Sequence, residues 1–383
     1  MKIAFRLTLL LIFFSIHSNA QVLSNGSGRN AISTSVPFLT ISPDARSSAM
    51  GEAGVALDDD ANATFWNPSK LAFINNTDKL SISYSPWLRQ VSSGSNLAYL
   101  SYAHRLNERS AVGVSFRYFN MGDINLYDSE EVGQGSVRPN EFSVDASFAR
   151  RMGENFSLAV SLRYIRSNLY QGTLNGIQSQ AGNAVATDVS FYYRHPANEP
   201  GRPSTFAVGV NVSNLGSKIS YVKNGTQYFL PANLKIGASK SLNIDDLSQL
   251  TLAFDVNKLL VPTPPLRDAT GNIISGRDNN RSVVSGIFGS FNDAPGGFKE
   301  ELKEVMLSPG VEYVYNKQFA LRAGYFYDAP SKGDRQYITL GTGFKVDDFN
   351  FDLSYLAATQ RSSALANTLR FSLVYSFGQI SRF

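Results

Sequence analysis

The chain has 383 residues, a net charge of +4 and no cysteine, with 17% charged and 12% aromatic residues. Without cysteine the chain cannot be a disulfide scaffold, and thiolate metal sites and cysteine nucleophiles are excluded as well. The basic residues form no stripe or cluster, so nothing in the sequence points to nucleic-acid binding.

The N-terminal residues 1–20 resemble a secretory signal peptide. Lys2 and Arg6 are basic, Leu7–Phe14 is almost entirely apolar, and Ser18–Ala20 supplies the small residues of a cleavage site. A membrane anchor is disfavoured because this run is too short to cross about 30 Å of hydrocarbon. No later segment reaches the roughly 18 apolar residues of a spanning helix. We therefore expect an exported chain that is not a helical membrane protein.

Residues 21–78 show no regular alternation and are rich in small side chains, which allow close packing against another surface. Asp58 and Asp60 imitate the start of a calcium-binding EF-hand loop. However, Ala63 and Ser69 stand where that loop requires glycine and glutamate. We predict turn and capping roles for the acidic residues and no metal site. The segment itself is expected to plug a wide barrel.

From residue 79 onward, apolar and polar side chains alternate with period two; Leu158, Val160 and Leu162, for example, are separated by small or polar residues. Such a segment has one apolar and one polar face when it forms a strand. Most of the segments are about nine to twelve residues long, which suits a tilted membrane strand better than a globular one. Fourteen segments follow the pattern: 79–86, 96–105, 109–120, 139–151, 155–167, 184–194, 204–214, 231–240, 249–258, 308–316, 318–328, 335–345, 348–358 and 366–377.

The connections between these segments alternate in length. Short turns surround Asn107, Gly153, 316–317 and 347–348, whereas the connections between them are mostly long. Bacterial outer-membrane barrels have short periplasmic turns and long external loops. A soluble β-sandwich is not expected to alternate short and long connections in this way. We therefore predict an all-β, transmembrane antiparallel barrel of about 14 strands in the outer membrane of a Gram-negative bacterium. The expected organisation is a signal peptide (1–20), an N-terminal extension and hatch inside the lumen (21–78), and the barrel (79–383).

Several charged residues fall on the inward face by parity. Facing them to lipid would cost a few kcal/mol each near the midplane. We expect them to solvate the lumen and hold the hatch, with an ion-selectivity filter as the alternative. These residues are Arg117, Asp145, Arg163, Asp188, Asp255, Arg322, Asp352 and Arg370.

The connection 259–307 is the longest, and structureless loops of this length are usually functional. It begins with an apolar, proline-rich run, continues with aromatic residues among glycines, and ends in a predicted amphipathic helix over 298–307. We predict a protein-binding surface, with a lid over the barrel mouth as the alternative. Its expected contact residues are Leu259, Leu260, Val261, Phe288, Phe291, Phe298 and Leu302.

No catalytic residue, cofactor or metal site is predicted. His104 lies near a strand end and His195 in an expected periplasmic turn at 195–198, and neither has a neighbour with metal-ligand spacing. The sequence also lacks the Gly-x-Ser-x-Gly elbow of serine hydrolases. An outer-membrane deacylase that uses His104 or His195 remains a further alternative, because such sites are assembled across strands.

The predicted hatch carries a recognisable signature: the run DARSSAMG from Asp44 to Gly51, an alanine-rich acidic stretch, and Asn67-Pro68-Ser69. It resembles the hatch of FadL-type fatty-acid transporters and is closer to their PorV/PorQ branch, which belongs to the type IX secretion system. Ser69 stands where that branch usually has alanine. The signature residues are Asp44, Arg46, Met50, Gly51, Asp60, Asn67 and Pro68.

The resemblance implies an adaptor or shuttle rather than an enzyme. Such a protein docks on the large translocon barrel, receives the C-terminal domains of cargo proteins, and delivers them to a surface attachment complex with a sortase. Its other partner is outer-membrane lipid. The alternative is a FadL-type transporter of hydrophobic small molecules. The mainly small and polar residues expected inside the barrel favour the adaptor.

Overall fold

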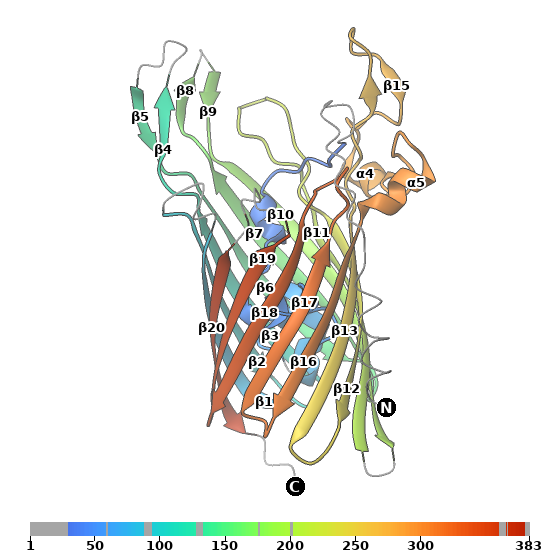
Figure 1. The fold of residues 1–383 in the computed structure, drawn as a ribbon. Helices are drawn as coiled ribbons and strands as arrows, with labels where there is room; N and C mark the ends of the chain where they lie inside the picture. Colours follow the sequence, from blue (N-terminus) through green and yellow to red (C-terminus); the bar gives the residue numbers. More distant parts are fainter. Residues whose placement is uncertain are drawn as a thin grey trace, which may run out of the picture.

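The computed structural model describes residues 30–379, except 59, 88–93, 128–132, 175–176, 200–201, 360–364 and 366. The expected signal peptide lies outside these residues. Fourteen antiparallel strands form a closed barrel in sequential order, and the first pairs with the last (Figure 1). They are β1 (Asn76–Pro86), β2 (Asn96–Arg105), β3 (Ser110–Asn120), β6 (Asn140–Arg151), β7 (Phe156–Asn168), β10 (Gly182–Glu199), β11 (Arg202–Gly216), β12 (Asn233–Asn243), β13 (Ser248–Leu259), β16 (Val305–Tyr315), β17 (Phe319–Tyr327), β18 (Gln336–Val346), β19 (Phe349–Ala358) and β20 (Thr368–Gln379).

The strands alternate in burial as the sequence predicts. Along β7, the apolar side chains of Leu158, Val160 and Leu162 are exposed on the outer surface, whereas Ser161 and Arg163 are buried inside. An apolar outer surface around a polar interior is the arrangement of a membrane barrel, because lipid contacts one face and the lumen the other. The fourteen predicted segments and the predicted barrel are confirmed.

The turn predicted at 195–198 is wrong, because β10 runs on to Glu199 and pairs there with the start of β11. Pro196 lies opposite Thr205 within this extension. On its other side, β10 pairs with β7 only as far as Tyr193. The missing N–H of Pro196 therefore faces a free strand edge, where proline is tolerated.

The long connections gather at one end of the barrel, at the top in Figure 1, which identifies the external side. Two hairpins rise there, β4 (Ile124–Tyr127) with β5 (Gly133–Val137) and β8 (Gly172–Leu174) with β9 (Ile177–Ser179). The external loop (residues 260–304) holds β14 (Leu266–Arg267), β15 (Ile273–Ser275), α4 (Val283–Gly289), α5 (Phe298–Glu301) and the 3-10 helix η3 (Leu302–Glu304).

The predicted helix over 298–307 is thus too long. It ends at Glu304, and Val305 already belongs to β16, where it pairs with Lys258 of β13. Residues 305–307 belong to the strand because each one gains interstrand hydrogen bonds there. In the described part of the chain, no helix combines the length and apolar character needed to cross a membrane.

The hatch (residues 30–75) fills the middle of the lumen (blue in Figure 1) with short helical turns. These are η1 (Pro37–Thr40), α2 (Ala45–Ser48), α3 (Ala63–Trp66) and η2 (Pro68–Phe73). Asn30 lies at the external rim, where its N–H donates to the Ser331 carbonyl (2.9 Å) and its side-chain amide to the Pro264 carbonyl (3.0 Å). From Asn30 the chain descends through the lumen and joins β1 at the opposite end.

This course predicts that position 30 is reachable from outside the cell. The chain has no cysteine, so an Asn30→Cys variant carries a single thiol. We expect a membrane-impermeant maleimide to label it in intact cells. The matched control is Asp246→Cys, in the exposed turn between β12 and β13 at the other end, which should be labelled only after permeabilisation. Labelling of the control alone in intact cells would contradict this topology.

Candidate functional site

Asp44 joins α2 and α3, two of the helical turns of the hatch. Its Oδ2 accepts the Ser47 N–H at the start of α2 (2.9 Å), and its Oδ1 accepts the Trp66 indole N–H of α3 (2.6 Å). Both partners are buried with it. A carboxylate at a helix N-cap satisfies otherwise unpaired backbone donors, and here it also positions an aromatic side chain. Asp44 of the signature is thus a structural residue of the hatch.

Arg46 attaches the hatch to the barrel wall. Its guanidinium forms a bidentate pair with the Glu312 carboxylate of β16, at 3.0 and 2.8 Å, and its third nitrogen donates to the Asp58 carbonyl (3.0 Å). Glu312 also binds Arg322 (2.6 Å), which in turn binds Asp352 (2.7 Å). Charge-assisted, bidentate pairs are among the strongest polar contacts in proteins.

Met50 and Gly51 lie where the hatch backbone touches the wall. Gly51 has a positive φ of 68°, and its N–H donates to the Thr339 hydroxyl (2.8 Å). A Cβ added at Gly324 of the wall would collide with the backbone of Gly51, so both glycines are needed for this approach.

The remaining signature residues tie the hatch to itself and to β10. Asp60 forms a buried ion pair with Lys70 (2.9 Å), and Pro68 begins η2. The Asn67 side chain caps η2 through the Ser69 N–H (3.1 Å) and donates to the Phe191 carbonyl (2.9 Å). The seven predicted hatch residues therefore belong to one packed unit.

The inward charges predicted from parity are all buried. Asp255 accepts the backbone N–H groups of Gly54 and Val55 (2.7 and 2.9 Å), and Arg117 donates to the Phe38 and Leu39 carbonyls. Arg163 of β7 binds both Asp145 of β6 and Asp188 of β10. The wall charges are thus used to hold the hatch and to neutralise each other.

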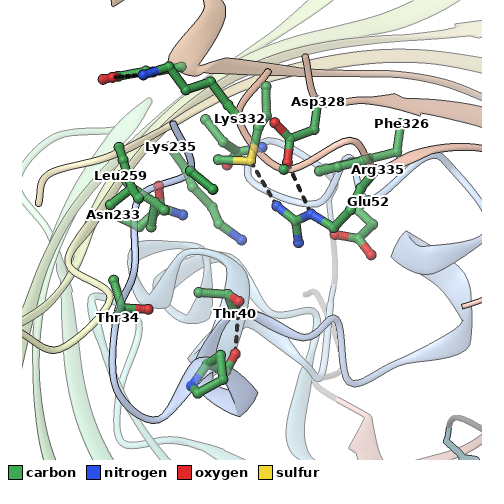
Figure 2. A pocket seen from close by; sticks show the side chains of 17 residues that line it. Thr34, Thr40, Glu52, Asn233, Lys235, Leu259, Phe326, Asp328, Lys332 and Arg335 are labelled. Carbon is green, nitrogen blue, oxygen red and sulfur yellow. Dashed lines mark hydrogen bonds and ion pairs between the residues drawn. The ribbon is translucent and has the colours of Figure 1, made fainter. Parts of the chain in front are cut away.

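Cavities remain on both sides of the hatch. On the external side lie an apolar cavity of about 780 Å³, lined by Phe38, Trp87 and Phe119, and a cavity of about 230 Å³ beside Lys235, lined by both polar and apolar side chains (Figure 2). On the other side, a polar cavity of about 460 Å³ reaches the Arg46–Glu312 pair.

A buried network of ion pairs fixes the external loop to the barrel rim. Glu304 lies between two ammonium groups, Lys258 of β13 (2.7 Å) and Lys332 of the β17–β18 connection (2.8 Å). Lys258 also binds Glu301 (3.0 Å), and Lys332 binds Glu300 (2.6 Å). Burial opposes ionisation of Glu301, but the Ala294 N–H and the Lys258 ammonium lower its pKa overall. The Glu301 carboxylate is therefore ionised at neutral pH and holds the loop through Lys258.

We predict that Glu304→Gln loosens the external loop. It leaves two buried lysines short of a counter-charge, at a cost on the order of 3 kcal/mol, so local opening should increase by about a hundredfold. Limited trypsin digestion should then cut within residues 260–304 at least about tenfold faster. The matched control is Glu108→Gln, on an exposed turn at the other end, and equal digestion of both variants would contradict the prediction.

The predicted contact residues of the loop fall into two groups. Phe288 and Phe298 are 76% and 75% exposed, and Phe291 and Leu302 are also exposed. Leu260 and Val261, which were also predicted as contact residues, are instead buried, at 3% and 1% exposed.

Leu260 is buried because the chain continues beyond β13 along the neighbouring strand, and its N–H donates to the Ala232 carbonyl (2.7 Å). Leu259 is half-buried and lines the cavity beside Lys235. Partner binding by the four exposed residues stays a prediction.

Sequence reasoning missed one pair of polar residues. Asp78 lies directly opposite His104 in the β1–β2 ladder, and its Oδ1 is 2.7 Å from the His104 Nδ1 and accepts the Tyr102 hydroxyl. Only the strand register brings them together. Within the described residues, no serine hydroxyl is hydrogen-bonded to His104, and no three acidic or histidine side chains form a metal-binding group.

Comparisons with known proteins give one result for the fold and another for the family. Among solved structures, the toluene transporter TodX of P. putida is 12% identical, with a TM-score of 0.50 over 88% of this chain and 99% of TodX. A TodX deltaS2S3 mutant, described as a monoaromatic hydrocarbon channel, has a TM-score of 0.53 at 12% identity and the same coverage. The toluene transporter TbuX of Ralstonia pickettii is 13% identical, with a TM-score of 0.48 over 88% of this chain and 98% of TbuX. A comparison with curated protein sequences gives no significant match.

The two TodX structures agree with the outer-membrane barrel fold, and their sequence identity of 12% is too low to support a conclusion about function. The sequence profile of the family described as "Type IX secretion system protein PorV" matches residues 24–266. This match covers well over half of the chain, including the hatch signature and the strands from β1 to β13. The chain therefore belongs to the PorV family of type IX secretion system proteins.

Proposed function

We propose that this chain is an outer-membrane adaptor of type IX secretion. It docks on the large translocon barrel, receives the C-terminal domains of cargo proteins, and delivers them to the surface attachment complex with its sortase. The signal peptide expected in residues 1–20 exports the chain. The hatch is fixed inside the barrel, so the working surface is the external face and the lumen is an anchor.

The observation that carries this proposal is the rigid external loop. Its buried ion pairs hold α5 and η3 on the rim, while Phe288 and Phe298 remain 76% and 75% exposed. Aromatic side chains that are fixed before binding lose little conformational entropy on docking, and they dominate the energetics of many interfaces. A barrel that binds no partner is not expected to present exposed aromatic side chains of this size at its external end.

The test is affinity purification of the full-length protein under mild detergent, from cells in which type IX secretion is active. We expect recovery of a much larger barrel protein and of cargo C-terminal domains in amounts comparable to the bait. Recovery of the chain alone under these conditions would contradict the proposal.

A second candidate function is transport of hydrophobic small molecules. The apolar cavity of about 780 Å³ between Phe38, Trp87 and Phe119 favours it, because ligand sites are usually apolar concavities of this size range. The test is mass spectrometry of organic extracts from the purified protein. A stoichiometric apolar ligand supports transport; extracts that contain only detergent and bulk membrane lipid favour the adaptor.

A further inference from the structure

Val36, near the start of the hatch, has a backbone conformation that its side chain disfavours. Its φ and ψ are 49° and 51°, in the left-handed region, and Pro37 follows it directly. A β-branched residue is rarely found in this region, and a following proline restricts the backbone further toward extended conformations. A strained conformation of this kind persists only where the surrounding structure imposes it, and such residues are frequent in switch regions. The contacts on both sides of Val36 must therefore hold it in place.

Two sets of hydrogen bonds flank Val36. On its C-terminal side, Arg117 of the barrel wall fixes η1 by donating to two of its carbonyl groups. On its N-terminal side, the Ser35 N–H donates to the Phe229 carbonyl (3.0 Å). Arg117 lies in the rigid strand β3, whereas Phe229 lies in the connection between β11 and β12. The strain at Val36 is therefore maintained on one side by the wall and on the other by a loop.

This connection, residues 217–232, packs against the first turn of the hatch. Ile219 and Tyr228 exchange two backbone hydrogen bonds (2.9 and 2.8 Å), which give the connection a hairpin-like form. The Ile219 side chain is buried in the same apolar cluster as Val36. The connection is thus an ordered element that covers Val36, and it holds Phe229 next to the hatch.

Phe229 also contacts the external loop. Its ring packs against Gly286 of α4, where an added Cβ would lie only 2.8 Å from the ring. The Lys218 ammonium lies 4.2 Å from the centroid of the same ring. Both α4 and the upper end of the hatch lie at the external mouth (Figure 1). One residue therefore touches the hatch through its carbonyl group and α4 through its ring.

The helix α4 is held less firmly than the rest of the external loop. It has no charged side chain, whereas α5 and η3 are fixed by buried ion pairs. Val284 and Phe288 of α4 are exposed, and Gly286 on the opposite side is buried against Phe229. Elements with few buried contacts are the ones that open most readily. A displacement of α4 would therefore act first on the Phe229 ring.

We propose that residues 217–232 form a latch that couples α4 to the hatch. When α4 shifts, the Phe229 ring moves with it, the hydrogen bond between Ser35 and Phe229 breaks, and Val36 relaxes to an extended backbone. This relaxation releases residues 30–36 of the hatch, while Arg117 keeps η1 in place. Docking of a partner on α4 would supply the shift, and in that respect the latch rests on the proposed function. The coupling itself is a property of the isolated chain.

The test is hydrogen–deuterium exchange with mass spectrometry on the purified full-length protein in detergent, without any partner. Gly286→Leu pushes the Phe229 ring away from α4, and Phe229→Ala removes the ring. Each variant should raise the exchange rate of the amides in residues 33–36 by about tenfold or more, because exchange there requires the latch to open. The matched control is Ser285→Leu, which adds the same side chain to the exposed side of α4 and should exchange like the wild type.

Both changes act through one ring, so their effects should not add. The double variant Gly286→Leu, Phe229→Ala should exchange like Phe229→Ala alone. If Gly286→Leu does not fold, Gly286→Ala replaces it, since its Cβ alone already meets the ring. Unchanged exchange of residues 33–36 in either single variant, or additive effects in the double variant, would overturn the proposal. Failure of docking would appear only in the affinity purification, because no partner is present here.

Discussion

Replacing Arg46 with alanine is expected to turn the plugged barrel into a conducting one. Arg46 carries the bidentate contact from the hatch to Glu312 and a further bond to the Asp58 carbonyl. Breaking a largely buried ion pair of this kind costs on the order of 3 kcal/mol, so displacement of the hatch should become about a hundredfold more frequent. The polar cavity beside Arg46 already opens toward the short-turn end, so a small shift of α2 is enough to extend it.

Single-channel recording in planar bilayers measures this effect. The Arg46→Ala barrel should show conductance steps at least about tenfold more often than the wild type, and cells that carry it should become sensitive to large hydrophilic antibiotics. The matched control is Arg138→Ala, which removes an exposed pair with Asp123 on the external side. Exposed pairs contribute little, so this variant should remain silent. A silent Arg46→Ala barrel in both assays would show that the hatch does not depend on this contact.

The second large effect is expected in the Phe288→Ser, Phe298→Ser double variant. Truncation of an aromatic anchor in an interface costs about 2 kcal/mol or more. Recovery of the large translocon barrel with the tagged chain should therefore fall by about tenfold or more. Both side chains are already exposed to solvent in the free protein, so the folding and membrane level of the barrel should not change.

Quantitative mass spectrometry of affinity-purified complexes makes this comparison. The matched control is Tyr127→Ser, another highly exposed aromatic at the external end, on the β4–β5 hairpin. It should leave recovery at the wild-type level. Equal recovery with the wild type, the double variant and the control would show that the external loop is not the docking element.

The sequence by itself determined the barrel and its orientation. Each strand alternates apolar and polar residues, and a fixed period of two assigns every side chain to lipid or lumen without knowledge of its neighbours. For this reason the inward positions of Arg163, Asp255 and Arg322 were predictable from parity. The sorted loop lengths identified the external end, and the small residues of the hatch predicted a plug.

Only the tertiary structure decided which groups meet. The pairing of Arg46 with Glu312, of Asp78 with His104, and of Glu304 with two lysines depends on strand register and loop path, which join residues far apart in the chain. The same long-range contacts buried Leu260 and placed the Lys235 ammonium over the rings of Phe65 and Trp66. Local periodicity states which face a residue occupies, whereas its partner is set by the whole fold. The residues that hold the hatch, present the loop and open a cavity could therefore be assigned only in three dimensions.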